Sequence, residues 1–208
     1  MTFTIVARDS MSGEMGVATT TCLVGVGDVV PAAKAGVGVV ACQAYIRPSS
    51  REALFTHLDA GTPLKTAVSL VLSGDENASQ RQILGMDLHG APFVYTGCGV
   101  DHIHGGIVGE HHAVAGNLLA HESVLHAMDM SFRSTSDLSL AQRLVKALTL
   151  GEQAGGDKRG RMSAALLVVA PTRRSLSLRI DYSQDPLNDL HMALEHRISP
   201  ELDEAFNR

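Results

Sequence analysis

The chain has 208 residues, of which 45% are hydrophobic and 19% are charged, with a formal net charge of −5 at pH 7. This composition excludes a largely disordered chain and predicts a folded protein with a sizeable buried core. The charge is mild and forms no basic stripe, so we expect neither nucleic acid nor a membrane surface as a partner.

The cysteines and the first residues predict a cytoplasmic protein. Cys22, Cys42 and Cys98 are odd in number and none lies in a Cys-x-x-Cys pair, so we expect reduced thiols. Arg8 and Asp9 interrupt the opening segment, which is therefore unlike a signal peptide. No apolar run approaches the length of about 18 residues that a membrane-spanning helix needs.

Strands are predicted at the start of the chain. Alternating apolar residues indicate strands over 3–8 and 15–21, with a hairpin turn at Ser12-Gly13 between them. Residues 24–36 are interrupted by Gly and Pro, so we expect a loop there. An apolar run predicts a third strand over 37–44 that is buried on both faces.

Helices are predicted next, followed by further strands. Ser49 or Ser50 is expected to cap a helix that ends at Gly61, and Thr62 is expected to cap a second one with Pro63 in its first turn. The remaining elements are strands over 82–87, 92–96 and 111–116, helices over 121–132 and 138–152, strands over 163–170 and 176–181, and a closing helix over 186–197.

This order of elements predicts the fold class. Strands and helices do not alternate one for one, which disfavours a doubly wound parallel sheet, and hairpin-linked strands indicate antiparallel sheets. Two stacked sheets with helices on both outer faces use every element. We therefore predict an α+β protein with a four-layer α-β-β-α sandwich. No linker or internal repeat interrupts the chain, so residues 1–208 are expected to form one domain.

Four segments of the chain resemble a known bacterial family. They are "MTFTIVARD", "VPAAKAGVGVVACQA", the "GN" at Gly116-Asn117 and "GGDKRGRMSAALLVV". Together they resemble the domain of unknown function 1028, a family grouped with the N-terminal nucleophile (Ntn) hydrolases, and the resemblance runs from Thr2 to about Asp181. It implies the same four-layer sandwich, similar to proteasome-type β chains.

The resemblance also implies a reaction. In Ntn hydrolases the first residue of the mature chain attacks an amide carbonyl, and its own α-amine, with an ordinary pKa of about 7.7–8.0, serves as the base. Removal of Met1 would make Thr2 this nucleophile. The implied activity is an amidohydrolase or peptidase that acts on a small amide or peptide and needs no cofactor.

Further site residues follow from the same resemblance. Lys34 is expected to lower the pKa of the Thr2 hydroxyl, and Asp157 to orient the amine or to pair with Arg159. Backbone N–H groups near Gly116 and the catalytic candidate Asn117 are expected to form an oxyanion hole. The candidates for contact with the substrate are Thr4, Gln43, His104, Gly116, Arg159 and Ser163.

Two alternatives remain open at this point. One is a member that kept the sandwich but binds a ligand or serves a structural role without catalysis. The other is a metal-dependent hydrolase that uses His102, His104 and His111, although His-x-His spacing alone is a weak metal signal. The sequence contains no nucleotide-binding glycine motif. Because Ntn-type chains often associate, we expect a homo-oligomer, most simply a twofold dimer.

Overall fold

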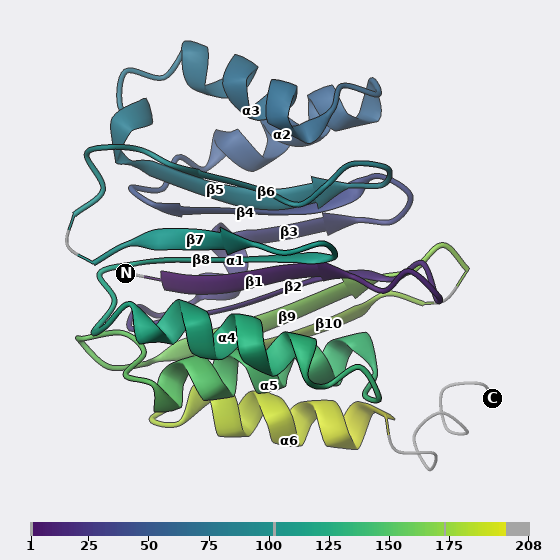
Figure 1. The fold of residues 1–208 in the computed structure, drawn as a ribbon, viewed down its shortest axis with the longest axis vertical. Helices are drawn as coiled ribbons and strands as arrows, with labels where there is room; N and C mark the ends of the chain where they lie inside the picture. Colours follow the sequence, from purple (N-terminus) through teal and green to yellow (C-terminus); the bar gives the residue numbers. More distant parts are fainter. Residues whose placement is uncertain (1, 102, 173, 199–208) are drawn as a thin grey trace.

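The computed structural model describes residues 2–101, 103–172 and 174–198. Two antiparallel sheets stack face to face, and helices cover both outer faces, as Figure 1 shows. The predicted four-layer α-β-β-α sandwich is therefore confirmed. In chain order the elements are β1 (Thr2–Arg8), β2 (Met15–Thr21), α1 (Val26–Val29), β3 (Pro31–Lys34), β4 (Gly38–Ala44), α2 (Ser49–Asp59), α3 (Leu64–Ser73), the 3-10 helix η1 (Ala78–Gln80), β5 (Arg81–Asp87), β6 (Phe93–Thr96), β7 (Gly105–Val108), β8 (His112–Asn117), α4 (Ser123–Arg133), α5 (Leu140–Gln153), β9 (Ser163–Val169), β10 (Leu176–Ile180) and α6 (Pro186–Ile198).

The larger sheet places the first strand near its centre. Its order is β10-β9-β2-β1-β8-β7, so β1 pairs with β2 on one side and with β8 on the other. In this register Thr2 lies opposite Thr21 and opposite Asn117. Pairing on both sides fixes the backbone of Thr2, which explains how a chain can begin a strand at its second residue without fraying.

The smaller sheet has the order β3-β4-β5-β6. Apolar side chains such as Val6, Val17, Val39 and Leu84 fill the layer between the two sheets. Helices α2 and α3 cover the other face of the small sheet, whereas α4, α5 and α6 cover that of the large sheet. Strands β4 and β5 are thus buried on both faces, as a strand in a middle layer has to be.

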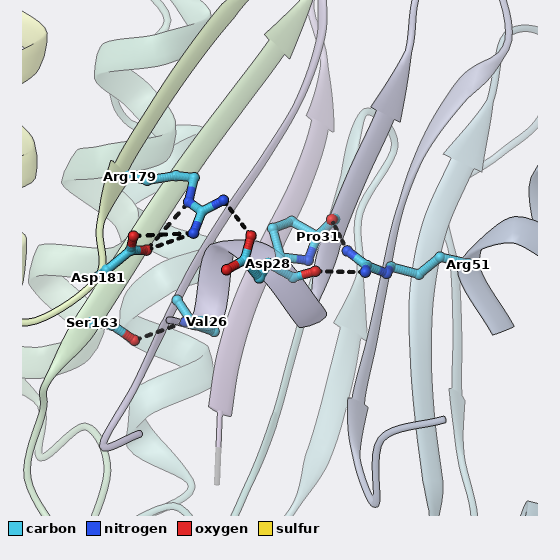
Figure 2. Close-up of polar contacts among 7 residues, drawn as sticks. All are labelled: Val26, Asp28, Pro31, Arg51, Ser163, Arg179 and Asp181. Carbon is cyan, nitrogen blue, oxygen red and sulfur yellow. Dashed lines mark hydrogen bonds and ion pairs between the residues drawn. The ribbon is translucent and has the colours of Figure 1, made fainter. Parts of the chain in front are cut away.

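Residues 24–36, expected to be a loop, contain helix α1 and strand β3 instead. Figure 2 shows why α1 is stable although it has only four residues. The Arg179 side chain of β10 pairs with the Asp28 carboxylate, and Arg51 of α2 donates to the carbonyl oxygens of Asp28 (2.6 Å) and Pro31 (2.8 Å). These contacts come from distant parts of the chain, so local sequence patterns did not indicate them.

Two helix starts also differ from the prediction. Neither Ser49 nor Ser50 caps α2, whose N-cap residue is Pro48, and no side chain of the N-cap residue Pro63 caps α3. The α3 backbone is satisfied from another element, because the Leu64 N–H donates to the carboxylate of Asp87 at 2.8 Å. Strand β7 was not predicted either, since it is short and begins with two glycines.

One glycine explains the close fit of α5 on the large sheet. A Cβ atom at Gly16 of β2 would lie 2.5 Å from Cδ1 of Leu144 in α5, and 3.2 Å from the backbone oxygen of Leu167. A larger residue would force at least the Leu144 side chain to move. Across the described residues, no helix combines the length and the apolar character that crossing a bilayer requires.

Candidate active site at the end of the central strand

Thr2 lies almost completely buried at the start of β1. Its exposed fraction is 5%, and its hydroxyl donates a long hydrogen bond of 3.4 Å to the Thr21 hydroxyl on β2. On the other side it lies opposite Asn117 of β8, which is 2% exposed. Met1 lies outside the described residues, so its removal stays a prediction.

Asp157 lies across the N-terminal end of β1. Its Oδ2 accepts a hydrogen bond of 3.2 Å from the backbone N–H of Cys22, which directly follows Thr21. Its backbone forms an isolated antiparallel bridge with Leu119, two residues beyond Asn117. Asp157 thus joins the strands on either side of β1, just beyond the point where Thr2 begins.

The charge at Asp157 is partly balanced by its neighbours. The backbone N–H of Arg159 donates to Oδ1 at 2.7 Å, and the Arg159 guanidinium lies 3.4 Å from Oδ2. The Asp157 side chain is only 1% exposed, whereas that of Arg159 is 38% exposed. The pKa of the Cys22 thiol is raised, mainly by burial and to a smaller extent by the negative charge of Asp157, so the thiol stays neutral.

A buried chain of hydrogen bonds connects this end of β1 to the second sheet. The Thr4 hydroxyl donates to Oε1 of Gln43 at 2.6 Å and lies 2.7 Å from the Thr19 hydroxyl. Because a hydroxyl has one proton to donate, Thr19 must be the donor to Thr4. Gln43 in turn donates through Nε2 to Oε1 of Gln82 at 2.8 Å. Every member therefore has a defined donor or acceptor role.

Gln82 is the centre of this network. Its Oε1 also accepts from Nδ2 of Asn117 at 3.0 Å. Its Nε2 lies within hydrogen-bond distance of Thr96 Oγ1 and of the carbonyl oxygens of Gly105 and Gly116, at 2.9, 3.1 and 3.0 Å. Sequence reasoning missed Gln82, although a glutamine inside an otherwise apolar strand is a signal that a buried polar contact exists.

Two strained residues mark the same end of the sandwich. Ala44 has φ 69° at the end of β4, and Leu118 has φ 53° directly after β8. Residues other than glycine rarely adopt this left-handed conformation, and they do so most often at functional sites. Both residues line a cavity of about 190 Å³ that Asn117 also lines.

A second cavity, of about 550 Å³, lies on the other side of the segment that follows β8. His104, Leu119, Ala120, Glu122 and Lys158 line it. Leu119, which lines this cavity, forms the bridge with Asp157, so the cavity lies near the end of β1. His104 is the predicted substrate-contact residue that lies here.

The structure does not bring Lys34 together with Thr2. Lys34 is the last residue of the edge strand β3, lies opposite Gly38, and pairs with Asp59 of α2 at 2.6 Å. Gln43, which contacts Thr4, is five residues further along β4, about 16 Å away at the usual rise per residue. Sequence distance from Thr2 did not indicate which end of β3 carries Lys34.

Other predicted substrate contacts lie below the surface. Thr4 (0% exposed) and Gln43 (1% exposed) belong to the buried network, and Gly116 is paired on both sides within the sheet. Ser163 accepts a hydrogen bond of 3.1 Å from the Val26 N–H (Figure 2). It also donates to the carbonyl of Leu23. These residues hold the strands and α1 in position. Because they are buried, a ligand cannot reach them in this structure.

The three-histidine metal site is not supported by the arrangement of the hairpin. His104 precedes β7 and His111 precedes β8, so the two lie at opposite ends of the β7–β8 hairpin, on the order of 15 Å apart. His102 lies outside the described residues. Within the described part of the chain, no three His, Cys, Asp or Glu side chains form a group that could hold a metal ion.

The fold and the site define a class of protein: a four-layer sandwich whose central strand begins with a buried threonine, at an end where a buried carboxylate joins the two flanking segments. The model of the "Family of unknown function (DUF1028)" matches residues 2–190, and the chain belongs to this family. The protein is similar to SPO2555 from Silicibacter pomeroyi, a solved DUF1028 structure, at 33% identity and a TM-score of 0.90, covering 98% of this chain and 92% of that one.

More distant solved structures also resemble it. Anbu from Hyphomicrobium sp. strain MC1 is 13% identical, with a TM-score of 0.48 and coverage of 99% and 97% of the two chains. Anbu (ancestral beta-subunit) from Yersinia bercovieri is 9% identical, with a TM-score of 0.46 and the same coverage. Likeness at this level says nothing about the activity of this chain. Among curated proteins, none matches it significantly.

Proposed function

We propose that the protein hydrolyses a small amide or peptide, with Thr2 as an N-terminal nucleophile after removal of Met1. The observation that carries this proposal is the position of Asp157, buried and joined to Cys22 and Leu119 across the end of β1. A free α-amine on Thr2 would emerge at this carboxylate. The amine and the hydroxyl of one residue would then be held by a strand that is paired on both sides.

The proposed reaction needs no group besides those on the chain and water. Thr2 Oγ1 attacks the amide carbonyl, and its proton passes to the α-amine. The tetrahedral intermediate collapses to an ester on Thr2, and the leaving nitrogen takes the proton. Water then attacks the ester with the same amine as base, which releases the acid and restores the hydroxyl. Asp157 orients the amine and stabilises its charged form.

We assign to Arg159 the part that the resemblance implied for Lys34. Its guanidinium is 3.4 Å from the Asp157 carboxylate, so it brings a positive charge to this end of β1. Gly116 lies inside the sheet, and its carbonyl accepts from Gln82. We therefore assign the oxyanion contact to backbone N–H groups at Asn117 and Leu118, where β8 ends and the chain turns.

The test combines intact mass with turnover of a panel of small amides. We expect protein purified without a tag to have lost Met1 and to hydrolyse at least one amide. Thr2→Ala should abolish turnover while leaving the melting temperature nearly unchanged, and Thr2→Ser should retain part of it. Thr66→Ala, on the exposed surface of α3, is the control and should behave as wild type. Retention of Met1 in the cellular protein would exclude the proposal.

A non-catalytic, ligand-binding role is the second candidate. It is favoured by the 5% exposure of Thr2 and by the hydrogen bond that its hydroxyl makes to Thr21. This role requires no free amine, so Thr2→Ala would leave ligand binding intact and no amide in the panel would be cleaved.

A cytoplasmic location and a twofold dimer stay part of the proposal. Sedimentation of the untagged protein measures the dimer.

A further inference from the structure

A small cavity beside the proposed nucleophile has the features of a specificity pocket, and its interpretation as a substrate pocket rests on the proposed function. We name it the Tyr45 pocket. Its lining includes Ala44, Tyr45, Val100, Asp101, Asn117 and Leu118. Asn117 lies opposite Thr2 in the β1–β8 pair, so the backbone of one residue that lines this pocket is about one strand spacing, roughly 5 Å, from the backbone of Thr2.

The Tyr45 ring is exposed but held in place. It is 57% exposed, and the Arg81 guanidinium lies 4.9 Å from the centre of the ring. Arg81 also donates to the Tyr45 carbonyl and forms a two-point ion pair with Asp75, with distances of 2.8 and 3.0 Å. The Arg81 and Asp75 side chains are 7% and 4% exposed. A buried ion pair thus fixes an aromatic ring that is itself open to solvent.

The size of the pocket limits what it can hold. Its volume is about 190 Å³. An apolar cavity of about 150 Å³ is large enough to bind benzene, so this pocket has room for one ring-sized group. Val100 and Leu118 provide apolar surface, and the face of Tyr45 is a surface on which rings and cations stack.

The charge of the pocket points to a cation. Asp101 is exposed at its edge, and none of the described residues that line it is basic. Among the described residues, Asp101 has no ion-pair partner. The nearby Arg47 and Arg81 both pair with Asp75, at 3.8 and 2.8 Å, so their charge is partly neutralised behind the ring. Asp101 is therefore the charged group that an occupant would meet.

We propose that the Tyr45 pocket binds a ring-sized, positively charged group of the substrate, which stacks on Tyr45 and pairs with Asp101. The substrate class is then a small amide that carries a compact cationic group next to the bond that is cleaved. The left-handed Ala44 and Leu118 shape the two sides of this pocket, which gives a physical reason for strain at both positions.

Binding of small probes tests this proposal without any turnover. We would titrate the protein with benzylamine, benzyl alcohol and benzoate and follow binding by NMR. Benzylamine should bind about tenfold more tightly than benzoate, with shifts centred on Tyr45 and Leu118. Asp101→Asn should remove most of this preference, and Tyr45→Ala should weaken all ring-containing probes. Asp137→Asn and Tyr182→Ala, at exposed positions elsewhere, are the matched controls and should change nothing.

The outcomes separate this inference from the proposed function. Equal binding of benzoate and benzylamine, or no effect of Asp101→Asn, would overturn the cation pocket even if amides are cleaved. Binding with the expected preference but no cleavage of any amide, including cationic ones, would support the pocket and count against Thr2 as a nucleophile. Unchanged folding of each variant is checked by its melting temperature and by the spectrum of its amide protons.

Discussion

The side-chain amide of Asn117 donates a hydrogen bond of 3.0 Å to Oε1 of Gln82, across the layer between the two sheets. One residue belongs to the strand that flanks Thr2, and the other belongs to the small sheet. The side chains between the two sheets are mostly apolar, but at the end near the candidate site they are polar, and this hydrogen bond joins the two sheets there.

Replacing Gln82 should be among the most destabilising single changes in the middle layer. Gln82→Leu keeps the volume but leaves Asn117 Nδ2 without its acceptor, and Gln43 Nε2 keeps only the Ala115 carbonyl at 3.3 Å. Each buried unsatisfied group costs about 1–3 kcal/mol. We expect a loss of about 2–5 kcal/mol in the free energy of unfolding, measured with urea. Gln153→Leu on the exposed face of α5 is the control, with an expected change within about 0.5 kcal/mol.

Lys34→Met should have almost no effect. The Lys34 and Asp59 side chains are 52% and 42% exposed, and solvent screens such a pair so strongly that it contributes less than about 1 kcal/mol. Melting temperature and amide turnover should both stay near wild type, whereas Arg159→Met should reduce turnover. If Lys34→Met abolished turnover without unfolding the protein, the assignment of the positive charge to Arg159 would be wrong.

Ala44→Gly should stabilise the protein while weakening the Tyr45 pocket. A left-handed conformation costs a non-glycine residue roughly 1–2 kcal/mol, and glycine costs about 0.5–1 kcal/mol in conformational entropy. The net gain is therefore between about 0 and about 1.5 kcal/mol. Ala60→Gly, at φ −79°, is the matched control and should be destabilising. Urea unfolding measures both. A loss of stability in Ala44→Gly would mean that Ala44 is not strained.

His112 should make stability depend on pH. It is 3% exposed, lies 2.8 Å from the Asp129 carboxylate and packs against Phe132. Burial lowers its pKa from 6.5 and outweighs the opposing effect of Asp129, while Arg133 and Arg143 lower the pKa further. The folded protein therefore binds a proton at His112 less readily than the unfolded chain does. As a result, the full free energy of unfolding is retained above about pH 6.5 and decreases as the pH falls below that value.

The comparison with His112→Gln isolates this effect from the other histidines. We would measure the free energy of unfolding of both proteins from pH 7.5 to pH 5. The wild-type curve should fall more steeply on the acid side than the curve of the variant. Parallel curves would show that His112 keeps its ordinary pKa in the folded protein.

The layers of the fold were predictable, because they follow from which strands are apolar on both faces and from which helices keep an apolar stripe. The two runs 38–44 and 81–87 lie in the middle layer as such strands should. Helix α1 was not predictable, since Arg51, Ser163 and Arg179 stabilise it from other layers. Strand β7 pairs along one side only, with β8, and its glycines carry no strand signal.

The site was predictable in part. The resemblance to the family led to Thr2, Asn117 and Asp157, which the structure brings to one end of the sandwich. It also led to Lys34, which lies at the other end of its strand, because spacing along the chain carries no information on strand direction. Tyr45 and Gln82 were missed, since their importance comes from Arg81 and from contacts between the sheets.

The pairing order of the large sheet also governs when the site comes into existence. Strand β1 stays unpaired on one side until β8, which ends at residue 117, has left the ribosome, and β2 stays so until β9, which ends at residue 169, has left it. Contacts between such distant parts of a chain make folding slow. Asp157 takes its place across the end of β1 only when this late half has docked. A chain caught midway through synthesis would therefore expose its first threonine without the neighbours that would make it reactive.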